Sequence, residues 1–136
     1  MFYEFEVIGK ITGKARPKVN TYTMRAYTPT QTKDYENLIK QYFVIKYPKY
    51  IPIENRIKIT IVAYFPILKN TSRTNTEKML NNEISPTKKP DIDNIVKIIL
   101  DALNKIAFKD DNQITKLDVE KKYDTVERIY VKIEEY

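Results

Sequence analysis

Residues 88–103 read KKPDIDNIVKIILDAL, and this stretch decides how the rest of the chain can fold. Its apolar side chains recur at helical spacing and would form one continuous helix face: Ile92, Ile95, Val96, Ile99, Leu100 and Leu103. Pro90 disfavours helical conformation in the residue before it, so the chain should be extended through Asp91 and helical from about Asp93. The stretch therefore predicts an amphipathic helix that packs on a core and is entered from extended chain.

Strand-like alternation of apolar and polar residues occurs on both sides of this helix. It is seen at residues 3–7, 57–65, 117–119 and 129–133. A second helical pattern opens at Thr28, Pro29 and Thr30 and ends before Pro48. The order strand, helix, strand, helix, strand, strand predicts an α+β fold of two layers, with one mixed β-sheet of about four strands covered by two helices. Residues 13–23 should form a basic loop, and residues 69–90 a long mobile loop.

Composition limits the classes of function. The chain has 136 residues, the usual size of one domain, so a single domain over residues 1–136 is expected. Its 24 Lys and Arg against 18 Asp and Glu favour a polyanionic partner, nucleic acid before an anionic membrane, although many basic proteins bind neither. The absence of Cys and His excludes serine-protease and cysteine-zinc chemistry. No apolar run approaches the roughly 20 residues that span a bilayer, and residues 1–10 do not resemble a signal peptide, so a soluble, cytoplasmic protein is expected.

Asp91 and Asp93 stand at the start of the predicted helix. In extended chain, carboxylates two residues apart point to the same side and could bind one cation. Taken alone, the pair is more typical of helix capping, in which an Asp complements the helix dipole for about 1 kcal/mol. Within the helix, Asp93, Lys97 and Asp101 follow at four-residue steps and line one polar stripe.

Asp111 can reach the same place if the chain turns back after the helix. The helix advances roughly 18 Å from Asp93 to Lys105, and six extended residues return up to about 20 Å. Residues 106–111 are therefore expected to run nearly straight and antiparallel to the helix. The alternative is that residues 110–113 form an ordinary polar turn.

Together, these residues resemble the RusA-like Holliday junction resolvases, a family found in bacteria and prophages. In residues 89–113 the family shows Lys-Pro-Asp-x-Asp-Asn, a Lys four residues after the second Asp, Asp-Ala-Leu in the helix, and Asp-Asp-x-Gln after it. This chain has them at residues 89–94, Lys97, residues 101–103, and Asp110, Asp111 and Gln113. Weaker similarity covers most of the chain: Lys14, Arg16, Pro17 and Lys18 resemble a basic arm of the family, and Lys121 matches a family Lys.

The resemblance implies a function and the residues that perform it. Asp91, Asp93 and Asp111 would be the essential acidic residues, and Lys97 an essential basic one. Family members act as homodimers with Mg²⁺ or Mn²⁺, and they cut two opposed strands of a four-way DNA junction symmetrically, in DNA recombination and repair.

The same residues suit metal-assisted hydrolysis of a phosphodiester. The carboxylates of Asp91, Asp93 and Asp111 would hold Mg²⁺ with several of its waters, one of which can become the nucleophile. Lys97 would stabilise negative charge on the phosphate, or else form a salt bridge with Asp93 or Asp101. Asp101 could equally orient Lys97 or be a solvated helix residue.

Basic residues from two segments should bind DNA phosphates without reading base identity. The main candidates are Lys14, Arg16, Lys18, Lys88 and Lys89, with Lys121 as a secondary candidate. The alternative is a solvated basic surface. No aromatic residue is assigned to DNA, because Tyr35, Tyr42 and Phe43 lie on an apolar helix face.

Three functions therefore compete. The leading one is a homodimeric, Mg²⁺-dependent endonuclease that acts on branched DNA and needs neither a membrane nor a small-molecule cofactor. The second is a non-catalytic branched-DNA-binding protein on the same scaffold, which would bind junctions with or without Mg²⁺. The third is a structural calcium or cap site on a basic domain with another partner.

Overall fold

The computed structural model describes all 136 residues. Its main sheet has the strand order β1-β6-β4-β5, with bounds Phe2–Ile8 for β1, Ile57–Pro66 for β4, Ile114–Asp124 for β5 and Arg128–Glu135 for β6. β6 runs antiparallel to both β1 and β4, whereas β5 runs parallel to β4. The predicted mixed sheet of about four strands is confirmed.

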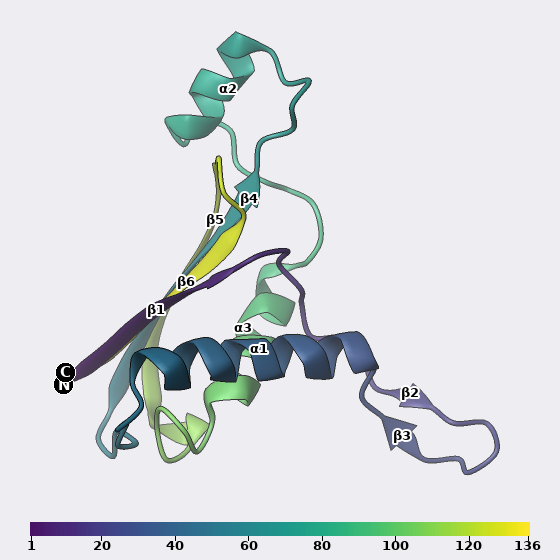
Figure 1. The fold of residues 1–136 in the computed structure, drawn as a ribbon, viewed down its shortest axis with the longest axis vertical. Helices are drawn as coiled ribbons and strands as arrows, with labels where there is room; N and C mark the ends of the chain where they lie inside the picture. Colours follow the sequence, from purple (N-terminus) through teal and green to yellow (C-terminus); the bar gives the residue numbers. More distant parts are fainter.

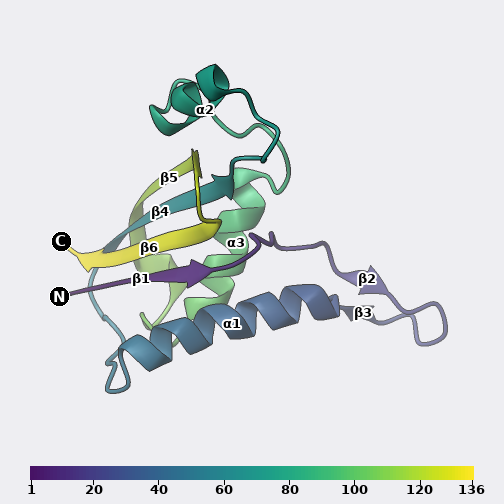
Figure 2. The same cartoon turned by 45° about the horizontal axis from the view of Figure 1, so that its top comes forward.

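Two helices cover one face of this sheet. α1 (Thr30–Lys46) and α3 (Ile92–Leu103) lie side by side on that face in both ribbon views (Figures 1 and 2). Alternate side chains of β1, β4 and β6 enter a common core with them, in which Ile61, Ile99 and Phe43 have no exposed surface. Burying each such side chain contributes about 1.5–3 kcal/mol. The predicted α+β class and its two covering helices are therefore confirmed.

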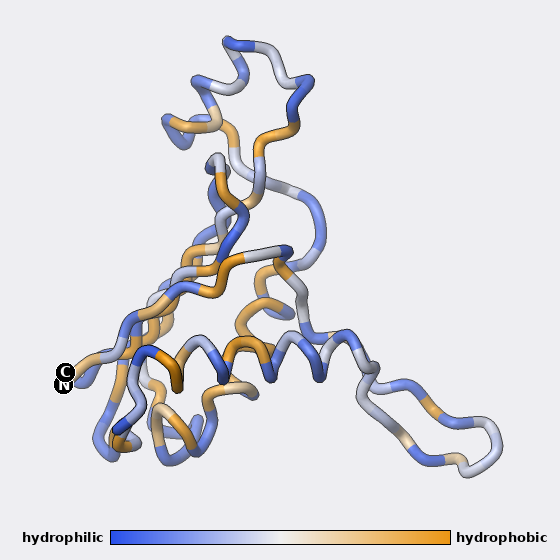
Figure 3. The backbone as a smooth tube through the Cα atoms, in the orientation of Figure 1, coloured by the Kyte–Doolittle hydropathy of each residue, from blue (hydrophilic) through white to orange (hydrophobic).

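The distribution of apolar residues agrees with this arrangement of a sheet covered by two helices. In Figure 3 the apolar residues concentrate where the sheet meets α1 and α3. The short helix α2 (Arg73–Leu80) and the ribbon formed by β2 (Lys18–Val19) and β3 (Ala26–Tyr27) are mostly hydrophilic or neutral, and they project from the body in different directions (Figure 1). None of the helices combines the length and the apolar character needed to cross a membrane.

The two projecting elements were not expected from the sequence. α2 lies in the stretch predicted to be a loop, and it begins where the Ser72 hydroxyl accepts a hydrogen bond from the Asn75 N–H at 3.2 Å. It buries no residue, so the sequence carries no apolar periodicity that would indicate a helix. The β2–β3 ribbon lies largely in the predicted basic loop and has only two residue pairs.

The return after α3 was predicted wrongly. Residues 106–111 do not run straight, because the N–H groups of Ile106 and Ala107 both donate to the Leu103 carbonyl at 3.0 Å and form a tight turn. Ala107 and the ring of Phe108 are fully buried. Burial of this apolar pair draws the chain into the core before it leaves again toward Asp111.

Candidate active site

The start of α3 presents two carboxylates without protein partners. Asp91 occupies the N-cap position with the extended backbone that was predicted (φ −68°, ψ 154°), yet its side chain makes no capping hydrogen bond. Asp93, in the first turn, is exposed and likewise has no hydrogen bond or ion pair. A capping hydrogen bond therefore accounts for neither side chain, although Asp93 in the first turn complements the helix dipole, and both carboxylates are free to bind a ligand.

A groove of about 510 Å³ between α3 and β5 gathers charged residues that the sequence singled out. Asp93, Lys97 and Asp101 line this acidic groove from α3, and Asp111 lines it from the 3₁₀ turn η1 (Asp111–Gln113). The rest of the lining is apolar: Ile92, Val96, Leu100, Leu117 and Val119. All four charged side chains are themselves exposed, so the groove is open to solvent and accessible to an ion or a phosphate.

Asp110 and Asp111 have different roles in the turn that follows α3. The Asp110 carboxylate accepts a hydrogen bond from the Asp111 N–H, and the Gln113 side chain accepts one from the Asp110 N–H, both at 2.9 Å. The Gln113 amide also donates to the Ile53 carbonyl at 2.8 Å, which ties the turn to the body. The polar-turn interpretation therefore fits Asp110 and Gln113, whereas the Asp111 carboxylate has no protein partner and lines the acidic groove.

Asp91 lines a different, more basic pocket of about 360 Å³. Lys10, Lys14 and Lys89 contribute to this basic pocket, together with Asn94. The structure thus brings Asp93 and Asp111 to one groove and places Asp91 in the neighbouring pocket.

The single chain does not assemble the predicted trio of carboxylates. No three acidic side chains lie close enough together to hold a metal ion. The oxygen donors that line the acidic groove do suit Mg²⁺, which is commonly bound by one or two carboxylates and keeps several waters. The chemistry of the donor set therefore fits a hard divalent cation.

Lys97 is the one basic residue that lines the acidic groove. It is exposed and pairs with neither Asp93 nor Asp101, so the salt-bridge alternative does not hold. Asp101 instead pairs with Lys14, with Nζ and Oδ2 3.2 Å apart. The sequence left open whether Asp101 orients Lys97 or is solvated. The structure shows an exposed Asp101 that pairs with Lys14 and does not orient Lys97.

Lys14 connects the chain after β1 to both covering helices. Its ammonium lies between Glu36 of α1 and Asp101 of α3, and its backbone N–H donates to the Asn94 carbonyl at 2.9 Å. Burial works to lower the pKa of Lys14, but the hydrogen bonds and charges of Glu36 and Asp101 outweigh it and raise the pKa above its ordinary value.

Lys121 of β5 holds the segment that enters α3. Its ammonium donates to the carbonyls of Lys88 and Pro90 at 2.5 and 3.1 Å and lies 5.1 Å from the centre of the Phe65 ring. Gly13 also lies against this segment: a Cβ on Gly13 would come within 2.7 Å of the Pro90 Cβ, so only glycine allows this close approach. Asp91 therefore follows a segment that both Lys121 and Gly13 contact.

The predicted DNA-binding residues divide into two groups. Arg16, Lys18, Lys88 and Lys89 are exposed and form no ion pair, so their charges are available to phosphates. Lys14 and Lys121, which were also predicted to contact DNA, have protein acceptors for their ammonium groups instead. Sequence reasoning did not single out Gly13, although it is one of only two glycines in the chain.

Two unpaired carboxylates and a lysine line one groove, with free basic residues nearby, an arrangement compatible with a nuclease. The sequence comparisons agree, because residues 9–134, nearly the whole chain, match the family described as Endodeoxyribonuclease RusA. The chain belongs to this RusA endodeoxyribonuclease family, and the resemblance stated from its motifs is confirmed. It is also similar to the uncharacterized protein YqaN of Bacillus subtilis (strain 168), with 31% identity over 137 residues that cover 97% of this chain and 95% of that one.

Proposed function

We propose that the protein is a metal-dependent, structure-selective endonuclease that resolves Holliday junctions by paired, symmetric strand nicks in DNA recombination and repair. Membership in the RusA family supports cleavage of DNA. The observation that carries the proposal is the acidic groove, in which Asp93 and Asp111 line the same hollow as the unpaired Lys97. Opposite charges in one hollow, without protein partners, are free to bind a metal ion and a phosphate.

In this proposal Asp93 and Asp111, which line one groove, would hold Mg²⁺, for which Mn²⁺ can substitute. Asp91 lies in the neighbouring pocket and would have to move toward them to become the third ligand. The ion, when bound, would lower the pKa of a water molecule and offset the charge of the phosphate. Lys97 donates to a phosphate oxygen as negative charge develops, a role in which one positioned donor is typically worth about 3 kcal/mol. Ile92 and Leu117, which also line the groove, are 43% and 48% exposed, so the groove is open to a DNA strand from solvent.

Branched DNA would be bound through its phosphates. Arg16, Lys18, Lys88 and Lys89 are free to make such contacts, and Lys10 and Lys89 line the basic pocket beside Asp91. These contacts orient the DNA without reading its sequence. The whole chain would act as one endonuclease domain, and two copies would act together because symmetric cutting requires one active site for each strand.

The decisive experiment compares a four-way junction with a duplex of the same sequence, with Mg²⁺ or with EDTA, for the native protein and Asp93→Asn. Paired nicks in the junction alone, dependent on Mg²⁺, are expected for the native protein. Asp93→Asn should lose cleavage while its circular dichroism stays unchanged. Its free energy of unfolding should fall by no more than about 1 kcal/mol, because the exposed Asp93 side chain makes no hydrogen bond or ion pair and stabilises α3 only through the helix dipole.

Asp118→Asn is the matched control. Asp118 is an exposed carboxylate on β5 that does not line the acidic groove, so its loss should leave cleavage intact. Equal loss of cleavage in both variants would contradict a specific role for Asp93.

The second candidate is a branched-DNA-binding protein without turnover. It is favoured by one observation, that no three acidic side chains gather into a metal site in the single chain. It predicts junction binding that is indifferent to Mg²⁺ and to Asp93→Asn, with no cutting. The same experiment therefore separates the two functions.

A further inference from the structure

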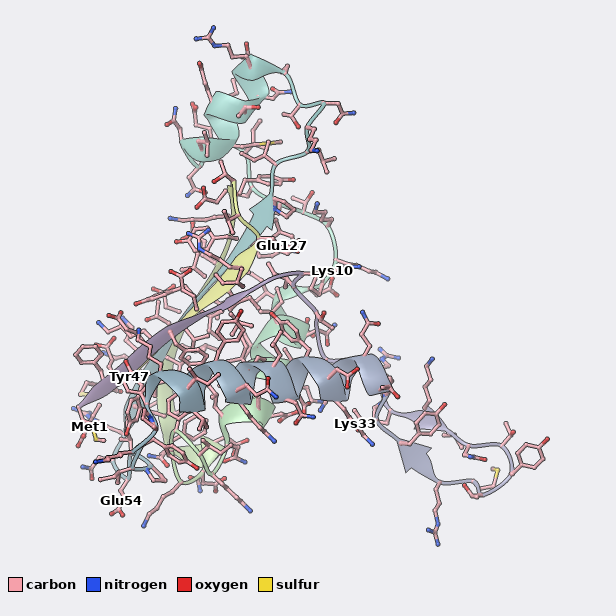
Figure 4. All side chains as sticks on the ribbon, in the orientation of Figure 1. Met1, Lys10, Lys33, Tyr47, Glu54 and Glu127 are labelled. Atoms are coloured by element: carbon pink, nitrogen blue, oxygen red, sulfur yellow. The ribbon has the colours of Figure 1, made fainter.

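The β2–β3 arm, residues 15–29, carries side chains for which the chain itself offers no partner. Every residue from 15 to 27 is exposed. Figure 2 shows the arm extending past the start of α1. Figure 4, in which Lys33 is labelled near the base of the arm, shows its side chains directed away from the body. Tyr22 is 97% exposed and Met24 is 76% exposed, and both lie at the tip.

The tip has a defined conformation. The backbone closes on itself through the Asn20 N–H to the Arg25 carbonyl at 2.9 Å and the Met24 N–H to the Asn20 carbonyl at 2.7 Å. Within this turn, the Asn20 side-chain oxygen accepts from the N–H groups of Tyr22 and Thr23 at 2.9 and 3.2 Å. Because these bonds use the backbone and Asn20 only, the Tyr22 ring contributes nothing to the turn and is left directed outward.

The charge of the residues around the tip indicates the kind of molecule that it binds. No acidic residue occurs from Val7 to Lys33, while Arg16, Lys18 and Arg25 lie on the arm itself. A surface of this kind attracts the phosphate backbone of a nucleic acid. A tyrosine ring presented among such cations can stack on the face of a base, an interaction that tolerates any sequence.

We infer that the tip of the arm is a base-stacking site, in which Tyr22 packs on an unpaired or unstacked base at the branch point of the DNA. In a continuous duplex the base faces are covered by their neighbours, so the ring finds a free face only where strands part. Arg16, Lys18 and Arg25 hold the flanking phosphates, and Met24 supplies a second apolar surface beside the ring. This inference rests on the proposed function, since it assumes that branched DNA is the substrate. It explains why the protein would bind branched DNA more tightly than a duplex, through contacts made by the arm.

The test measures binding of the full-length protein to a four-way junction and to a matched duplex, each with a fluorescent 2-aminopurine at the branch or at the equivalent paired position. Binding is measured in EDTA, so that no strand is cut. Tyr22→Ala should weaken junction binding by about 5- to 150-fold, the range expected for one stacked base, and should leave duplex binding unchanged. Tyr22→Phe keeps the ring and should bind as the native protein does.

Phe2→Ala is the control for loss of an exposed aromatic ring elsewhere, because Phe2 is 55% exposed on the edge strand β1. It should bind both DNAs normally. The fluorescence of the branch-point base should change when the native protein binds and should not change with Tyr22→Ala.

Several outcomes would overturn the inference. Native junction affinity in Tyr22→Ala, an equal loss on junction and duplex, or an unchanged branch-point signal with the native protein would each exclude base stacking. Loss of binding to anionic lipid vesicles in Tyr22→Ala, with junction binding intact, would assign the tip to a membrane instead. If the native protein prefers the junction and Tyr22→Ala shows the same preference, only this inference is excluded. If the native protein shows no preference for the junction over the duplex, the proposed function is excluded as well.

Discussion

Lys121 does not line the acidic groove, but its side chain holds the segment that leads into the candidate site. Its ammonium binds the carbonyls of Lys88 and Pro90, directly before Asp91. A hydrogen bond from a charged donor is worth about 1.5–3 kcal/mol, enough to keep one conformation of this segment over others. We therefore regard Lys121 as a positioning residue for Asp91.

Lys121→Met should lower the turnover number for junction cleavage by about 10- to 100-fold, the usual effect of displacing a reacting group by roughly 1 Å. Junction affinity should change by less than about twofold, because the ammonium is already bound to the protein and adds little to phosphate binding. Single-turnover cleavage and a binding titration separate the two quantities.

Lys121→Arg should restore part of the activity, since a guanidinium can still donate to the carbonyls of Lys88 and Pro90. Lys122→Met is the neighbouring control, because Lys122 pairs only with Glu120 on β5, at 3.7 Å. A fall in affinity without a fall in turnover would instead support the DNA contact that the sequence suggested for Lys121.

At the scale of elements, the site depends on how three parts of the chain meet at α3. α1 contributes Glu36, α3 contributes Asp101, and the chain after β1 contributes Lys14, which joins them. Only about a sixth of each of the side chains of Lys14 and Glu36 is exposed, so this pair is shielded from solvent. It connects the base of the β2–β3 arm to the helices that form the core.

Lys14→Met should lower the free energy of unfolding by about 1–3 kcal/mol, because Glu36 would be left without its partner in a partly buried place. Urea denaturation measures this change. The partners raise the pKa of Lys14, so its stabilising contribution is fully present below its ordinary value of 10.5 and is lost as the pH rises through the higher folded value.

Lys18→Met provides the comparison, since Lys18 is an exposed arm residue with no ion pair. It should leave the unfolding free energy unchanged within about 0.5 kcal/mol. Equal stability of the two variants would show that the Lys14 ion pairs do not stabilise the fold.

At the scale of the whole molecule, binding to DNA should be dominated by phosphate contacts and should weaken steeply with salt. Each phosphate contact adds about 0.9 to the slope of log affinity against log salt concentration. Arg16→Ala should therefore reduce this slope by about 0.9 on junction and duplex alike. Lys49→Ala, at an exposed position just after α1 and at the end opposite the arm, should leave the slope unchanged. A slope that Arg16→Ala does not alter would remove this residue from the phosphate contacts.

The proposed symmetric cutting also makes a prediction about assembly. The chain has a mass of 16.2 kDa, and sedimentation at the concentrations that support cleavage should give about twice this value, because paired nicks need two active sites. A monomer that still makes paired nicks would contradict the homodimer.

The sequence by itself determined the parts of this protein that local chemistry controls. The periodicity of residues 92–103 predicted α3, the pattern before Pro48 predicted α1, and strict alternation predicted β1, β4 and β6, because burial on one face imposes a period on the sequence. The motif around residues 89–113 identified the RusA family, which the comparisons confirmed.

Only the tertiary structure decided how the charged side chains are paired. The protein partners of Lys14, Asp101 and Lys121 lie on other elements, and no local pattern in the sequence reports such contacts. The burial of Phe108 turned the chain after α3 away from its predicted straight path, and α2 formed without an apolar face to indicate it. Sequence patterns record which residues face a core, whereas the meeting of polar groups from distant segments is set by the packing of the whole chain.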